Sequence, residues 1–123
     1  MKKMILSLGI ISVLIACGDS GQAKKEEPKV EDITQNPDYQ KGLSLLAGSD
    51  CLTCHKVDEG ITGPSYKEVA NKYPNADEAT IKDLAGKIIK GGSGVYGTAI
   101  MTPHPAITEE DAIAMVKYIL LLK

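Results

Sequence analysis

The sequence predicts an all-α fold, one small helical domain over residues 36–123. Two observations favour this fold class. Apolar residues recur three and four positions apart in four segments, which is the spacing that places them on one face of an α-helix. Each segment is also bounded by residues that begin or end helices, such as Asn, Thr, Gly and Pro.

The first two helices are expected on either side of a cysteine-containing segment. One opens with Pro37 after the capping residue Asn36 and stops at Gly48. The other runs over about 65–73 and ends before Pro74, because proline cannot continue a helix. The residues expected to face inward are Tyr39, Leu43 and Leu46 in the first helix and Tyr66, Val69, Ala70 and Tyr73 in the second.

The last two helices follow from the same reasoning. Asn75 or Asp77 caps a third helix, which Gly91 and Gly92 terminate. Thr108 begins the fourth, whose first turn carries three acidic residues where negative charge suits the helix dipole. The residues expected to face inward are Ile81, Leu84, Ala85, Ile88 and Ile89 in the third helix and Ile113, Val116, Ile119 and Leu120 in the fourth.

The pentapeptide Cys51-Leu52-Thr53-Cys54-His55 lies between the first two helices and has the C-x-x-C-H pattern of haem attachment. Two thiols on one helical turn can add as thioethers to the two vinyl groups of a haem. The adjacent His55 imidazole then lies beneath the porphyrin, where a neutral ring nitrogen can bind iron. We therefore predict one covalently attached c-type haem (heme c), held by Cys51 and Cys54 with His55 as an axial ligand.

Three other interpretations of the pentapeptide were weighed. A thioredoxin-type redox pair expects a βαβ context, but no alternating β-branched run flanks Cys51. A zinc site would require the sequence neighbours Cys54 and His55 to chelate one tetrahedral ion, which is awkward. A disulfide between Cys51 and Cys54 would close a very small loop and stabilise little.

Composition supports a large apolar cofactor and excludes one class of partner. The chain has no Phe, no Trp and only five Tyr, so a domain of this size lacks aromatic bulk for its core, and a buried porphyrin would supply it. The chain has no Arg, and 14 Lys face 16 Asp and Glu for a net charge of −2. An acidic chain of this kind is not expected to bind nucleic acid.

The N-terminus predicts export and lipid attachment. Lys2 and Lys3 precede an apolar run over 4–16, too short to span a membrane and typical of a signal peptide over residues 1–16. The run ends in Leu14-Ile15-Ala16-Cys17, which resembles the lipobox of bacterial lipoproteins. We expect lipid on Cys17 and a periplasmic, membrane-anchored protein. The alternative is ordinary cleavage with an unpaired cysteine left over.

A flexible tether is expected over residues 17–35. This stretch is rich in Gly, Ser, Gln, Lys and Glu and has too little apolar surface to offset the entropy of ordering it. The alternative, an amphipathic helix from Lys24 to Asp32, fails because Pro28 interrupts it. The domain boundaries expected are therefore 1–16, 17–35 and 36–123.

The domain resembles a class I c-type cytochrome of the bacterial c-551/c-552 type. The matching stretches are Cys51 to His55, Gly63-Pro64-Ser65-Tyr66-Lys67-Glu68-Val69-Ala70, Gly91-Gly92-Ser93-Gly94-Val95-Tyr96-Gly97 leading to Met101, and the closing helix ending Val116-Lys117-Tyr118-Ile119-Leu120. The resemblance implies a small fold of four to five helices around one haem. It also implies a close crossing of the first and last helices through Gly42 and Tyr118.

The resemblance extends to residues around the haem. It implies that a carbonyl near Pro64 accepts the second N–H of the proximal imidazole. Tyr96 stands where the family often has Trp and is expected to donate a hydrogen bond to a haem propionate. Ile100 and Thr102 stand where the family often has Pro, which removes a backbone constraint beside the ligand loop.

Met101 is the candidate for the second axial ligand of the iron. It lies in a loop bounded by Gly and Pro, whereas Met115 lies in the final helix beside its apolar stripe and is interpreted as packing. His104 is the rival ligand. It stands between Pro103 and Pro105 and is interpreted as a solvent-facing residue or one that supports the site.

Two axial ligands leave iron without an open position for substrate, which argues against an enzyme. We therefore predict a membrane-tethered, monomeric carrier of single electrons that meets redox donor and acceptor proteins through short-lived contacts. A haem-based sensor, in which a small gas displaces Met101, is the alternative. A thiol or zinc module is a third possibility.

Overall fold

The structure is a computed structural model that describes residues 32–123, so the predicted signal peptide, Cys17 and nearly all of the predicted tether lie outside the described residues. The four expected helices are all present, which confirms the mostly helical fold. A short β-hairpin was not expected. The elements in chain order are η1 (Ile33–Gln35), α1 (Pro37–Ala47), η2 (Cys51–Thr53), α2 (Tyr66–Lys72), α3 (Glu78–Lys90), β1 (Gly92–Gly94), β2 (Gly97–Met101) and α4 (Glu109–Leu121).

The helix starts follow the capping residues expected from the sequence. The Asn36 side chain accepts a hydrogen bond from the N–H of Asp38 at 2.8 Å at the start of α1. At the start of α3, Asp77 rather than Asn75 is the cap, and its carboxylate accepts from the N–H of Thr80 at 2.8 Å. Thr108 caps α4 in the same way. Local hydrogen bonds thus fix where these three helices begin.

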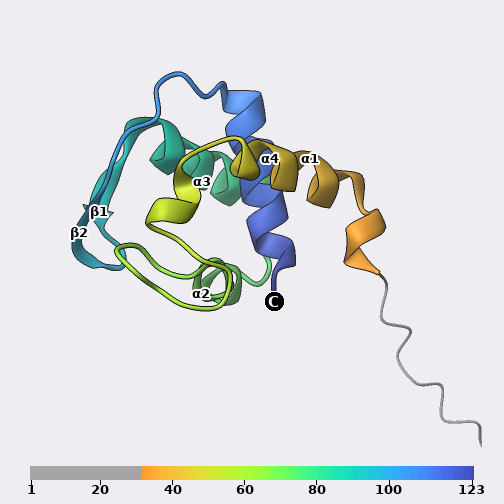
Figure 1. Cartoon of the computed structure of the whole chain (residues 1–123), viewed down its shortest axis with the longest axis horizontal. Coiled ribbons are helices and arrows are strands. Elements are labelled where there is room, and N and C mark those ends of the chain that lie inside the picture. The colour runs from red at the N-terminus through yellow and green to blue at the C-terminus, as the bar shows by residue number, and fades with distance from the viewer. Residues whose placement is uncertain (1–31) are drawn as a thin grey trace, which may run out of the picture. The chain divides into compact units, whose positions relative to one another are not determined.

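Helix α4 forms the centre of the core, because it contacts each of the other three helices (Figure 1). Met115 is almost fully buried in α4, as its interpretation as a packing residue requires. Tyr118 and Tyr39 meet with their ring centroids 5.0 Å apart. The buried apolar residues that form the main cluster are Leu46, Tyr66, Ala85, Ile88, Ala112, Met115, Val116, Tyr118, Ile119 and Leu122.

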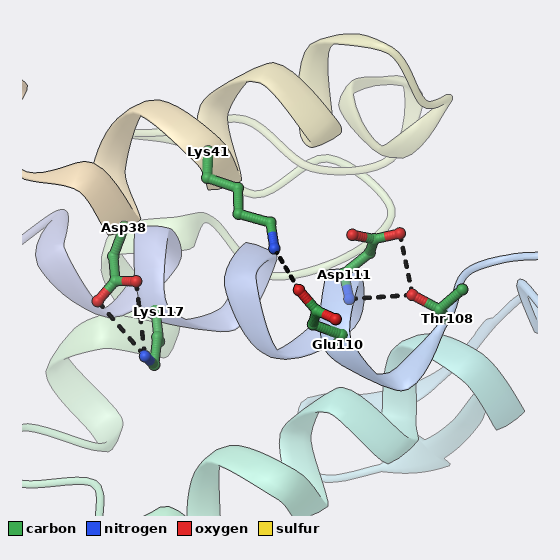
Figure 2. Close-up of polar contacts among 6 residues, drawn as sticks. All are labelled: Asp38, Lys41, Thr108, Glu110, Asp111 and Lys117. Carbon is green, nitrogen blue, oxygen red and sulfur yellow. Dashed lines mark hydrogen bonds and ion pairs between the residues drawn. The ribbon is translucent and has the colours of Figure 1, made fainter.

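Helices α1 and α4 approach closely at Gly42. An added Cβ at Gly42 would overlap the Cβ of Tyr118 and the carbonyl oxygen of Ala114, so only glycine fits this crossing. Two ion pairs bridge the same helices at the surface (Figure 2). Lys41 binds Glu110 at 2.8 Å, and Lys117 binds Asp38 at 3.5 Å.

Two details differ from the sequence-based expectations. Leu43 was expected to face inward but is 42% exposed. The face of α1 that lies against α4 is the one that carries Gly42, so the neighbouring Leu43 side chain is left partly in solvent. The residues after α3 form the hairpin β1–β2, with Gly92 opposite Met101 and Gly94 opposite Gly97.

Among residues 32–123, no helix is both long and apolar enough to cross a membrane.

Candidate functional site

The attachment segment forms one tight turn at η2. The Cys51 carbonyl oxygen accepts hydrogen bonds from the N–H groups of Cys54 at 3.2 Å and His55 at 3.0 Å. This turn brings both thiols and the imidazole into one short segment. Cys51 is half-buried and Cys54 is exposed. Burial, assisted by the nearby charge of Asp50, raises the pKa of the Cys51 thiol.

His55 is held in one tautomer by the carbonyl of Pro64. The distance from His55 Nδ1 to Pro64 O is 2.7 Å. A carbonyl oxygen can only accept, so Nδ1 carries the proton and Nε2 keeps its lone pair. An imidazole in this state is the form that binds a metal through Nε2, and the carbonyl partner fixes the orientation of the ring.

Two further residues confine the His55 ring. An added Cβ at Gly63 would overlap the ring, so the imidazole lies directly against the glycine backbone. The ring of Tyr66 stacks on the imidazole, with centroids 5.6 Å apart and planes inclined by 18°. Neither contact was predicted as part of the site, although Gly63 and Tyr66 both belong to the stretch that carries the family resemblance.

The loop between η2 and α2 is bonded to itself and to the start of α2. The N–H of Gly63 donates to the Cys54 carbonyl at 2.9 Å. The N–H of Tyr66 donates to the Lys56 carbonyl at 2.9 Å, which satisfies one of the N–H groups that a helix start leaves unpaired. Ser65 and Glu68 form a capping box at the same helix start. The Pro64 carbonyl is therefore carried by a well-bonded segment.

Met101 ends strand β2 and is half-buried against the main apolar cluster. Its partner across the hairpin is Gly92. Gly91, with φ 69°, lies so close to the Met101 carbonyl oxygen that an added Cβ would overlap it. The ligand predicted from the sequence is thus carried by a strand that runs directly over the end of α3.

Tyr96 lies at the turn of the hairpin and is 40% exposed. Burial of part of the ring, followed by the charges of Tyr73 and Glu68, raises the pKa of Tyr96 to about 12. The Lys72 ammonium lies 5.0 Å from the ring centroid, within cation–π range. The phenol is therefore a protonated donor at neutral pH, as the expected hydrogen bond to a propionate requires.

His104, expected either to face solvent or to support the site, is partly buried rather than solvent-facing. Its side chain is only 21% exposed, and Nε2 lies 3.1 Å from the carboxylate of Asp50. Asp50 immediately precedes Cys51, and the sequence contained no sign of this contact.

The residues of the site fit a haem. The donor pair offered by His55 and Met101, an imidazole nitrogen and a thioether sulfur, suits haem iron. The buried hydroxyl of Tyr66, beside the proximal histidine, has no hydrogen-bond partner among the described residues. Within residues 32–123, no three His, Cys, Asp or Glu side chains gather as a metal site. Large apolar side chains are exposed on the attachment segment, the following loop and the hairpin, namely Leu52, Ile61, Val95 and Ile100.

Comparison with known proteins agrees with this site. The sequence profile of the Cytochrome c family matches residues 39–123. Cytochrome c-552 of Nitrosomonas europaea is 39% identical over 84 residues, which cover 68% of this chain and 81% of that protein. Cytochrome c-551 of Allochromatium vinosum is 38% identical over 88 residues, covering 72% of this chain and 93% of that one.

Solved structures match as well. The crystal structure of wild-type Nitrosomonas europaea cytochrome c552 has a TM-score of 0.61 at 40% identity and covers 66% of this chain and 99% of its own. The class 1 cytochrome MtoD of Sideroxydans lithotrophicus has a TM-score of 0.55 at 28% identity, covering 68% and 94%. Haem c is held covalently through the motif of Cys51, Cys54 and His55. The chain belongs to the cytochrome c family as a class I monohaem electron carrier of the c-551/c-552 type.

Proposed function

We propose that His55 and Met101 bind the two faces of the haem iron and that the protein carries single electrons between redox proteins while tethered to a membrane. The observation that carries the assignment of His55 is the 2.7 Å contact between its Nδ1 and Pro64 O, because it leaves Nε2 free to bind. When bound, the haem supplies a one-electron ferric and ferrous couple.

The side chains around the iron determine how readily it accepts an electron. A thioether is soft and neutral, so Met101 favours ferrous over ferric iron relative to a second imidazole. Met101 is also half-buried, and a low-dielectric environment disfavours the extra positive charge of the ferric state. Both effects favour a high working potential, while the occupied sixth position excludes substrate and water from the iron.

Replacement of Met101 tests the ligand assignment. Met101→His should lower the reduction potential, and each tenfold change in the ferric-to-ferrous preference corresponds to about 59 mV. Met101→Ala should let the reduced protein bind carbon monoxide, seen as a shift of its absorption bands. The control is Met115→Leu, because Met115 is 1% exposed in the core and should leave both properties nearly unchanged.

The same spectra distinguish the carrier from a gas sensor. A carrier with a firmly bound Met101 should show sharp low-spin bands that carbon monoxide does not shift in the wild type. A shift in the wild-type protein would instead favour the sensor with a displaceable methionine. Low-spin bands that survive in Met101→Ala but are lost in His104→Ala would replace the assignment with a bis-histidine site.

Support for the tether comes from the sequence. We propose that residues 1–16 are removed as a signal peptide, that Cys17 carries lipid and that residues 17–35 link it to the cytochrome domain on the periplasmic side of a bacterial membrane. A coil of this length spans roughly 20–30 Å, enough to let the domain turn toward different partners. Encounters with redox partners of this kind are small and transient.

Mass spectrometry tests the lipid anchor. The wild-type protein extracted from membranes should carry acyl groups on Cys17, whereas Cys17→Ser should lack lipid and accumulate with its leader. Ser20→Ala, a neighbouring change that keeps the cysteine, should be processed normally. An intact mass without lipid on wild-type Cys17 would rule the anchor out.

A further inference from the structure

A hydrogen bond connects the segment that follows Met101 to the segment that bears Cys51, Cys54 and His55. His104 follows Met101 by three positions, and Asp50 immediately precedes Cys51. His104 Nε2 lies 3.1 Å from Asp50 Oδ1, although the two residues are 54 positions apart in the chain. A carboxylate only accepts hydrogen bonds, so Nε2–H of His104 is the donor.

The backbone at His104 is itself held in place. The His104 N–H donates to the carbonyls of Ile88 and Ile89, both at 3.1 Å, at the end of α3. Pro103 and Pro105 restrict the chain on either side. Because the backbone of His104 is already held, pairing with Asp50 requires the ordering of side chains only, and not of the backbone at His104.

The strand that carries Met101 has few other attachments. Residues 92–100 are all exposed, so burial contributes little to holding the hairpin in place. Near Met101 the strand is held by the pairing with Gly92, by the close passage over Gly91 and by the packing of the Met101 side chain against the apolar cluster. The hydrogen bond between Asp50 and His104 joins the segment that directly follows this strand to the residue that precedes Cys51.

We infer that Asp50 and His104 are positioning residues, a clasp that holds the Met101 strand against the haem-attachment segment and so keeps the methionine on the iron. The clasp rests on the proposed ligation by Met101. Its function is to slow the opening of the ligand strand, because Met101 can leave the iron only when its strand moves away from the segment that carries Cys51 and His55.

The rate at which imidazole displaces Met101 from the ferric, haem-loaded protein tests the clasp. The sulfur-to-iron charge-transfer absorption reports the bound methionine. Asp50→Ala and His104→Ala should each accelerate displacement about threefold, the size expected for a partly exposed pair. The double variant should be no faster than either single variant, because both remove the same contact. His104→Gln, which retains an N–H donor, should restore much of the wild-type rate.

The control is Asp58→Ala, which removes an exposed carboxylate of the same charge from the attachment loop, where it pairs with Lys67 at 2.8 Å. It should leave the displacement rate unchanged. The clasp is refuted if Asp50→Ala has no effect, if Asp58→Ala accelerates displacement equally, or if the Asp50 and His104 effects add in the double variant.

Amide hydrogen exchange separates the clasp from the ligand assignment. Exchange in residues 97–104 should be faster in Asp50→Ala than in the wild type whether or not Met101 is bound. A wild-type protein without the sulfur absorption would overturn ligation by Met101, and with it the role of the clasp in retaining that ligand. A normal sulfur absorption with unchanged exchange in Asp50→Ala would overturn the clasp alone.

Discussion

The crossing of α1 and α4 makes a strong prediction for Gly42→Ala. In most helices this change is stabilising, because alanine is about 1 kcal/mol better than glycine in a helix interior. At Gly42 the new methyl group would overlap the Cβ of Tyr118 and the carbonyl oxygen of Ala114. The carbonyl belongs to the α4 backbone, so the clash cannot be relieved by a side-chain rotation and the two helices must separate.

The magnitude follows from two opposing effects. Overpacking of a well-packed contact costs about 1–3 kcal/mol, and a clash with backbone lies toward the upper end. The gain in helix propensity offsets about 1 kcal/mol of this cost. The surface pair of Lys41 and Glu110 (Figure 2) is 46% and 83% exposed and stabilises the crossing little. The net expectation is a loss of about 1–2 kcal/mol, or roughly 5–15 °C in Tm for a domain of this size.

This loss can be measured by thermal and denaturant unfolding of the haem-loaded protein, followed by far-UV circular dichroism. Gly86→Ala is the matched control, since Gly86 also lies within a helix but an added Cβ there has no heavy atom within 4 Å. Gly86→Ala should stabilise the protein by about 0.5–1 kcal/mol. The reasoning is refuted if the two variants change stability in the same direction.

Two further predictions concern folding and pH. Replacing Cys51 and Cys54 together by Ala should give a haem-free chain without cooperative unfolding by circular dichroism, and a fully helical apo chain would contradict this. The Glu68 carboxylate accepts a hydrogen bond from the Ser65 N–H, which lowers the pKa of Glu68. The ionised carboxylate therefore stabilises the fold fully above the ordinary pKa of Glu, and this stabilisation is lost as pH falls through the lowered pKa. Wild type should therefore lose more stability than Glu68→Gln between about pH 5 and 3, with Glu59→Gln as the charge-matched control.

The sequence predicts those elements whose determinants are local. Asn36, Asp77 and Thr108 each cap a helix through an N–H two or three residues ahead, so the residue type and its place before an apolar run are sufficient. The hairpin was missed for a physical reason. Gly92 and Gly94 adopt positive φ and carry no side chain, so the strand has no apolar alternation to recognise.

In the haem site, too, the residues that are adjacent in sequence could be predicted, whereas a contact between distant residues could not. Cys51, Cys54 and His55 are recognisable because attachment chemistry requires them next to one another. The bond from His55 to the Pro64 carbonyl was expected from the family resemblance, and the structure has it. The pair of Asp50 and His104 could not be predicted, because it joins residues 54 positions apart and depends on where the hairpin places the chain.

The two sides of the iron are therefore built differently. On the side of His55, a covalent attachment, a carbonyl bond from Pro64 and close contacts with Gly63 and Tyr66 all constrain one ring. Met101, the proposed ligand on the other side, is itself partly buried, but it ends a hairpin whose residues 92–100 are exposed and rich in glycine. A segment with little buried area opens at a lower free energy than the core. If Met101 is the ligand, as we propose, its bond to the iron is the one that contacts of this exposed hairpin have to protect.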